Sequence, residues 1–172
     1  MSYKFRIHLI PSTAYGQNMR KKLKSSEWLS LSAYVRDIEV CAGCHKHFPL
    51  TKLEAHEEWS FKNGKQKLKH IVPLCKKCHR AVHIGRALHA GKFKKASKRL
   101  MKYGKLSESE FYDFYNNAWS KRNYLSKFKY KLTTSKKKAW KIAKKDKEQL
   151  TKILKKLSKK QKSKENLEQQ NL

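Results

Sequence analysis

The chain has 172 residues, enough for one compact domain with appendages but too few for two full-sized hydrophobic cores. Its formal net charge of +30 and isoelectric point near 10.1 favour a polyanionic partner. No run of about 18 apolar residues could span a membrane, and residues 1–6 do not lead into the apolar core of a signal peptide. We therefore expect a cytoplasmic protein that binds DNA, with RNA as the other candidate, and has no membrane association.

Residues 1–40 mix apolar and basic side chains and form an N-terminal lead-in. The apolar residues of Ile7–Ile10, just before Pro11, indicate a short strand or an extended segment. From Ser25 to Ile38 the apolar residues recur close to helical spacing, which predicts a helix. This section should pack on the one that follows.

Residues 41–92 hold all four cysteines, in two C-x-x-C pairs: Cys41 with Cys44, and Cys75 with Cys78. In a reducing compartment such pairs favour a tetrahedral zinc ion over disulfides. Four thiolates leave no open position for water, so this zinc would be structural.

The same section has a hairpin pattern followed by a helix pattern. Asn63-Gly64 favours a tight turn between a strand over Leu53–Phe61 and the apolar run Ile71–Leu74. If Cys78 begins a helix, His79 and His83 lie four residues apart on one face and can bind a single cation.

These residues together resemble the HNH endonucleases, the ββα-metal or His-Me finger superfamily. The resemblance covers about a quarter of the chain, and the residues that carry it are Cys41-x-x-Cys44, Leu53-Glu54-Ala55-His56-Glu57-Glu58-Trp59 and Leu74-Cys75-x-x-Cys78-His79-x-x-x-His83-Ile84-Gly85. It looks closest to the bacterial and phage subgroup that reads His-Glu-x-Trp where the wider family reads His-His or Asp-His. The stretch from Ile10 to Trp28 also looks like the lead-in of that subgroup.

The resemblance implies an α+β fold with a small zinc-stabilised ββα-metal finger, hydrolysing phosphodiester bonds in DNA with one Mg²⁺ or Mn²⁺. His79 and His83 are then the metal ligands. A histidine titrates near neutrality, so we favour His56 as the general base, or as its neighbour on the metal, with Glu57 as the rival base or an extra ligand. His70 replaces the family's central asparagine, and either orients the base or has a structural role.

The remaining sections are basic and helical in pattern. Residues 93–126 form a predicted helical extension, in which Ser107 and Glu110 match a capping box and an aromatic stripe at helical spacing should pack in the core. Residues 127–172 hold seventeen lysines against four acidic residues, which predicts a partly helical or disordered tail that binds nucleic acid. If helical, the tail has an apolar stripe and either docks on the body or folds only on binding; we expect the fold to survive its removal. The stripe residues are Trp140, Ile142, Leu150, Ile153, Leu154 and Leu157. The expected phosphate contacts of the finger are Lys76, Lys77, Arg80, Arg86 and Lys92.

Two other classes of protein remain open. Ala55 cannot ligate a metal, and together with His70 it favours a non-catalytic zinc-finger protein that binds nucleic acid. A structural or RNA-associated basic protein is the third class. Retention of His56, His79 and His83 together favours the nuclease, and the small size favours a phage or mobile-element enzyme. We expect the other histidines, His8, His45, His47 and His89, to be surface groups, and we leave the oligomeric state open.

Overall fold

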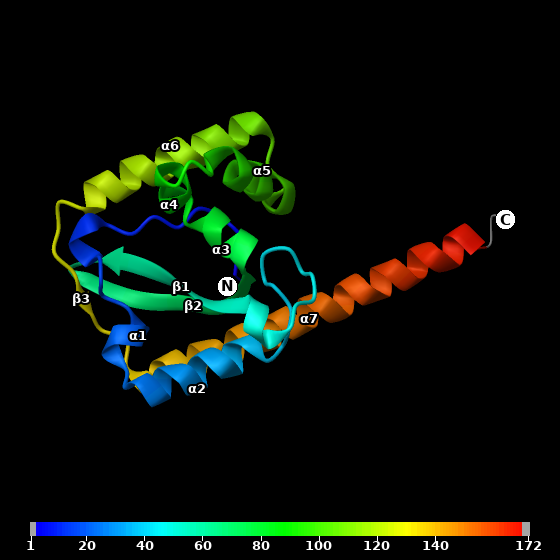
Figure 1. Cartoon of the computed structure of the whole chain (residues 1–172), viewed down its shortest axis with the longest axis horizontal. Helices are drawn as coiled ribbons and strands as arrows, with labels where there is room; N and C mark the ends of the chain where they lie inside the picture. The colour runs from blue at the N-terminus through cyan, green and yellow to red at the C-terminus, as the bar shows by residue number, and fades with distance from the viewer. Residues whose placement is uncertain (1–2, 170–172) are drawn as a thin grey trace.

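The computed structural model describes residues 3–169 and has the predicted α+β class. Its elements, in chain order, are η1 (Ser12–Ala14), α1 (Met19–Lys22), α2 (Ser25–Arg36), η2 (Leu50–Lys52), β1 (Leu53–Lys62), β2 (Lys65–Cys75), α3 (Lys76–Val82), α4 (Ile84–His89), α5 (Phe93–Gly104), α6 (Glu108–Leu125), β3 (Lys131–Leu132) and α7 (Lys136–Gln169). A long hairpin lies at the centre, with helices on both sides (Figure 1). No described helix is both long and apolar enough to cross a membrane.

The hairpin forms where the sequence predicted it. β1 and β2 pair antiparallel from Leu53 opposite Cys75 to Lys62 opposite Lys65. Asn63 and Gly64 make the turn with φ angles of 49° and 66°, the left-handed conformation that these two residue types tolerate best. Short β3 then adds in parallel to the turn end of β2.

Of the two alternatives for Ile7–Ile10, a short strand or an extended segment, the structure has the extended segment. This segment is extended but pairs with no strand; instead the backbone N–H of His8 donates to the carbonyl of Val82 at 2.8 Å. The lead-in therefore runs along α3, the helix that closes the finger.

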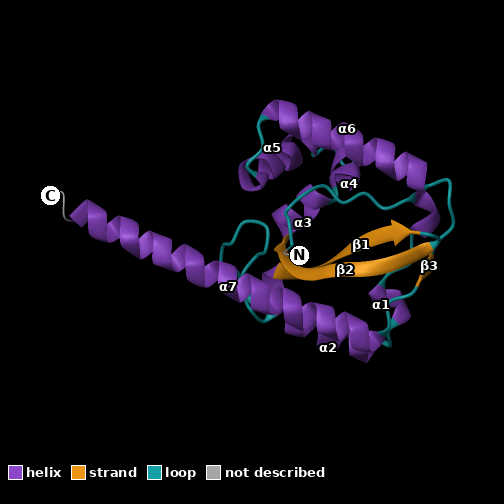
Figure 2. Ribbon diagram, turned by 180° about the vertical axis from the view of Figure 1, so that it is seen from behind, coloured by secondary structure: helices purple, strands orange, loops and turns teal. Residues whose placement is uncertain are grey.

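The alternation of side chains along β1 divides the core into two layers. Ala55 and Trp59 pack against the apolar cluster that contains Leu31 of α2 and Ala143 of α7. His56, between them in sequence, points to the opposite face and meets α3. Figure 2 shows the same division, with α3, α4, α5 and α6 on one side of the hairpin and α1, α2 and α7 on the other.

The C-terminal section is not a separate tail. The first half of α7 packs on β2 and α2, where Ala139, Ala143 and Leu150 are buried. The expectation that residues 127–172 are dispensable for folding is therefore wrong, because their removal would expose both apolar clusters to water. Beyond the buried half, α7 extends past the body of the protein to Gln169 (Figure 1). Of the two predicted states of residues 127–172, helical or disordered, the described part is therefore mostly helical. Residues 170–172 lie outside the described part of the chain.

The predicted capping box of α6 is confirmed, but its aromatic stripe is only partly in the core. The backbone N–H of Glu110 donates to the Ser107 hydroxyl, and the Glu110 carboxylate accepts from the Ser107 N–H. Phe111 is fully buried, whereas Phe114 is 53% exposed. The helix thus uses some of its aromatic residues for packing and presents others to solvent.

Candidate metal centres beside the hairpin

The four cysteines meet at the open end of the hairpin and are all buried. Cys41 and Cys44 come from the turn after α2, Cys75 ends β2 and Cys78 lies in α3. Their sulfur atoms all lie within 4.8 Å of one another. A tetrahedral zinc ion with Zn–S bonds of about 2.3 Å holds its sulfurs about 3.8 Å apart, so this cluster fits a closed, structural zinc site.

Polar groups around the sulfurs match the charge of such a site. The Sγ of Cys41 accepts from the backbone N–H of Gly43 at 3.4 Å and of Cys75 at 3.3 Å. Arg99 of α5 places Nε 3.1 Å from Cys78 Sγ. Four thiolates around Zn²⁺ carry a net charge of −2, and these donors offset it while tying α5 to the finger.

Three histidines form a second cluster on the same hairpin-helix unit. His56 comes from the middle of β1, His79 from α3 and His83 from the residue that ends α3, and one ring nitrogen of each lies within 4.8 Å of the others. His79 Nε2 and His83 Nε2 are 3.2 Å apart. Two nitrogens bound to one cation at about 2.1 Å lie about 3.0–3.4 Å apart, so the spacing suits a shared ion.

The protonation of the histidine cluster also suits a cation. Glu54 accepts a hydrogen bond from Nδ1 of His79, which leaves the Nε2 lone pair free for a metal. Burial lowers the pKa of His56 far below its usual value and that of His83 to about 3, and the neighbouring histidines add to both effects. Both rings are therefore neutral at pH 7, the form that binds metals. Nδ1 of His56 is buried without a hydrogen-bond partner among the described residues.

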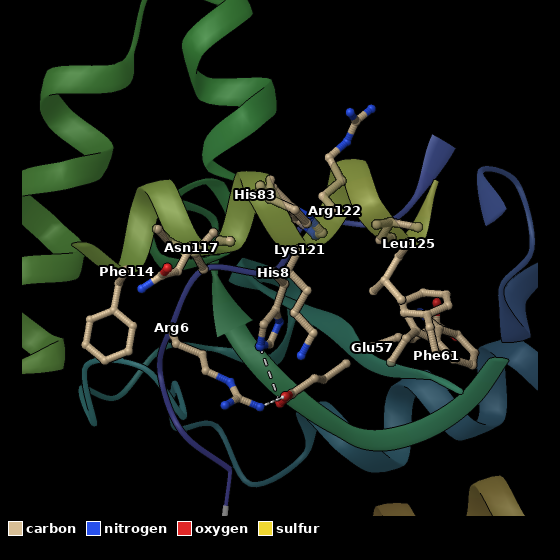
Figure 3. A pocket seen from close by; sticks show the side chains of 16 residues that line it. Arg6, His8, Glu57, Phe61, His83, Phe114, Asn117, Lys121, Arg122 and Leu125 are labelled. Carbon is tan, nitrogen blue, oxygen red and sulfur yellow. Dashed lines mark hydrogen bonds and ion pairs between the residues drawn. The ribbon is translucent and has the colours of Figure 1, made fainter. Parts of the chain in front are cut away.

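His8, expected to be a surface group, belongs to this cluster. Its ring stacks on that of His56 with the centroids 4.9 Å apart, and its Nδ1 lies 2.6 Å from His56 Nε2. Its Nε2 is 3.4 Å from Glu58, which also pairs with Arg6 at 2.5 Å. The dashed lines from Arg6 and His8 in Figure 3 mark these two interactions with Glu58, whose side chain carries no label there. No sequence motif marks His8, because it is 48 residues from its partner and comes from the lead-in.

Glu58 provides a negative charge beside His8. Burial acts to raise the pKa of this carboxyl, but the contacts with His8 and with the Arg6 guanidinium outweigh burial and hold the pKa at about 2. Glu58 is thus ionised throughout the neutral range and orients the His8 ring.

Glu57 is not brought into the cluster. It follows His56 on β1 and so points to the other face, where its carboxylate accepts from the backbone N–H of Met19 at 2.8 Å. Burial raises the pKa of Glu57 to about 7, although the bond from Met19 opposes the shift. This carboxylate acts as the anchor of α1.

His70 lies on β2 and is also held by a carboxylate. Its Nδ1 is 2.8 Å from Oδ1 of Asp146 in α7, and Oδ2 of the same residue accepts from the Ile71 N–H at 2.8 Å. His70 therefore joins β2 to α7, and it makes no hydrogen bond to the three clustered histidines.

The five predicted phosphate contacts lie along α3, α4 and the start of α5. Lys76, Lys77, Arg86 and Lys92 are exposed, and Arg80 is half-buried. No protein-family model matches the chain, and no curated protein or solved structure has a significant similarity to it.

Proposed function

We propose that the chain is a metal-dependent endonuclease that hydrolyses phosphodiester bonds in DNA. The observation that carries the proposal is the convergence of His56, His79 and His83 on one cation site, on the same hairpin and helix that hold the cysteine cluster. A protein that only binds nucleic acid needs the zinc for stability, but it has no use for a second site of neutral imidazoles.

A divalent cation at the histidine site would supply Lewis acidity to a phosphate and to its leaving oxygen. Imidazole ligands suit transition metals better than Mg²⁺, which prefers oxygen. The resemblance implies Mg²⁺ or Mn²⁺, whereas three imidazole ligands favour a later transition metal such as Ni²⁺ or Zn²⁺. An activity assay therefore has to compare Mg²⁺, Mn²⁺, Ni²⁺ and Zn²⁺.

The geometry supports separate roles for the histidines. His56 groups with the two histidines of α3, so we assign it as the third cation ligand. His8 is the remaining imidazole of the cluster, and Glu58 and Arg6 fix its orientation. We therefore assign His8 as the group that accepts the proton of the attacking water, at Nδ1, because Nε2 faces Glu58. The water would replace the present contact between His8 Nδ1 and His56.

Basic residues would hold the DNA backbone near this site. Beside the five phosphate contacts of the finger, α7 presents exposed lysines along its length, among them Lys137, Lys141, Lys144 and Lys152. Such contacts are independent of sequence and release counterions, so binding should weaken steeply with salt.

The test is cleavage of supercoiled plasmid by the purified protein with each of the four ions. His79→Ala should abolish both cleavage and binding of the second metal ion, whereas His8→Gln should abolish cleavage and leave the metal content unchanged. His89→Ala is the matched control, because this histidine is exposed and lies in α4, outside the cluster. Tight DNA binding with a full zinc complement but no cleavage by any ion would favour the non-catalytic zinc-finger protein instead.

A further inference from the structure

A cleft opens from the histidine cluster between the lead-in, β1 and α6. Its walls include His8, His83 and, from α6, Asn117, Lys121 and Arg122 (Figure 3). Its volume is about 260 Å³, just below the roughly 300–1,000 Å³ of small-ligand sites. It can take part of one strand but not a duplex, whose major groove alone is about 12 Å wide.

The α6 wall of the cleft carries positive charge beside the candidate metal centre. Lys121 is exposed and forms no ion pair with any described residue. Arg122 is half-buried, with its guanidinium 5.2 Å from the Trp119 ring. A phosphodiester backbone in the cleft would therefore meet Lys121 at one point and the histidines at another.

Exposed aromatic rings gather where α6 ends. Tyr15, Tyr124 and Phe128 are 62%, 60% and 45% exposed, and the rings of Tyr124 and Phe128 are 5.3 Å apart. Arg122 links these rings to the cleft, because it lines the cleft and donates to the Tyr15 hydroxyl at 3.1 Å. We call Tyr15, Tyr124 and Phe128 the aromatic platform.

The aromatic platform is held in place by its neighbours. Thr13 Oγ1 donates to the carbonyl of Phe128 at 2.6 Å, and Ser126 Oγ accepts from the N–H of Ser12 at 3.0 Å. These bonds join η1 to the end of α6. The chain that carries the rings is thus held in position while the rings are open to solvent, which is the arrangement that stacks unpaired bases in proteins that bind single strands.

We propose that the preferred substrate is an unpaired stretch of DNA, an inference that rests on the proposed nuclease function. The backbone of one strand passes through the cleft along Lys121, one phosphate reaches the histidine cluster, and neighbouring bases stack on the aromatic platform. A paired strand cannot offer its bases in this way, because each is already stacked and paired within the duplex.

Binding is measured first, by fluorescence anisotropy without added divalent ions, so that no cleavage occurs. The probe is a labelled oligonucleotide of about 12 nucleotides, either single-stranded or annealed to its full complement. The double variant Tyr124→Ala/Phe128→Ala should bind the single strand at least about tenfold more weakly, since each stacked base contributes roughly 5- to 150-fold. Its affinity for the duplex and its salt dependence should stay unchanged, because stacking releases no counterions.

Two further variants sharpen the measurement. Tyr112→Ala is the matched control: this tyrosine is also on α6 and 45% exposed, but it belongs to neither the cleft nor the aromatic platform. It should bind both probes like the wild type. Lys121→Gln should lower the salt slope for the single strand by about 0.7.

Cleavage of the same probes with added metal separates this inference from the nuclease proposal. Single-strand binding no tighter than duplex binding, or unchanged in the double variant, would overturn the inference. Equal cleavage of duplex by the wild type and the double variant, with no preference for the single strand, would overturn it while supporting the nuclease. Platform-dependent binding without cleavage by any ion would uphold the single-strand site and overturn the nuclease.

Discussion

Replacement of Asp146 tests whether α7 is part of the fold. This carboxylate is 5% exposed and accepts hydrogen bonds from Nδ1 of His70 and from the N–H of Ile71. Asp146→Ala leaves both partners buried without an acceptor, at about 1–3 kcal/mol each. We therefore expect the free energy of unfolding to fall by about 2–6 kcal/mol, which corresponds to a loss of at least about 4 °C in Tm.

The assay is urea unfolding of the zinc-loaded protein, followed by circular dichroism. Asp146→Asn should lose less stability than the alanine variant, since its amide oxygen can still accept from Ile71. Asp113→Ala, at an exposed position of α6, should stay within about 0.5 kcal/mol of the wild type. An alanine variant at Asp146 that unfolds like the wild type would show that α7 is a detachable tail after all.

Three further outcomes are expected. Glu57→Gln should be more stable than the wild type above pH 7. The native pKa of Glu57 is about 7 against an ordinary 4.5, so the wild type loses stability as the pH rises from 4.5 through 7, by up to about 3 kcal/mol. Equal pH profiles of the two proteins in urea titrations would contradict this. Glu54→Gln should weaken metal binding at the histidine site by about 10- to 100-fold, measured by calorimetry, with zinc content unchanged as the control. Removal of zinc by a strong chelator should unfold the finger, because the four buried cysteines join the segment after α2 to β2 and α3 through the ion. Native-like amide dispersion in NMR spectra of the metal-free protein would disprove this.

Local rules explain what could be predicted from the sequence. The turn at Asn63-Gly64 requires positive φ angles, which few other pairs accept, so the hairpin followed from two residues. The C-x-x-C spacing predicted the cluster of four cysteines. The four-residue spacing of His79 and His83 predicted that the two side chains lie on one face of a helix, and in the structure their ring nitrogens lie close together at α3. Alternation along β1 places His56 and Glu57 on opposite faces, so the expectation of Glu57 as an extra ligand beside His56 does not fit the structure, in which its carboxylate binds the Met19 N–H.

The tertiary structure alone decided which distant residues complete the sites. His8 reaches His56 only because the lead-in runs along α3, and Asp146 reaches His70 only because α7 docks on β2. Neither contact has a sequence signature, since each joins segments at least 48 residues apart through packing of surfaces rather than through local spacing. The lysine excess of residues 127–172 predicted a tail that binds nucleic acid and left open whether it docks. Packing decides this, because Ala139, Ala143 and Leu150 are buried against the rest of the protein. Residue spacing along the chain therefore predicted the hairpin, the cysteine cluster and the two histidines of α3. Packing between segments far apart in sequence decided that the lead-in and α7 complete the structure around them.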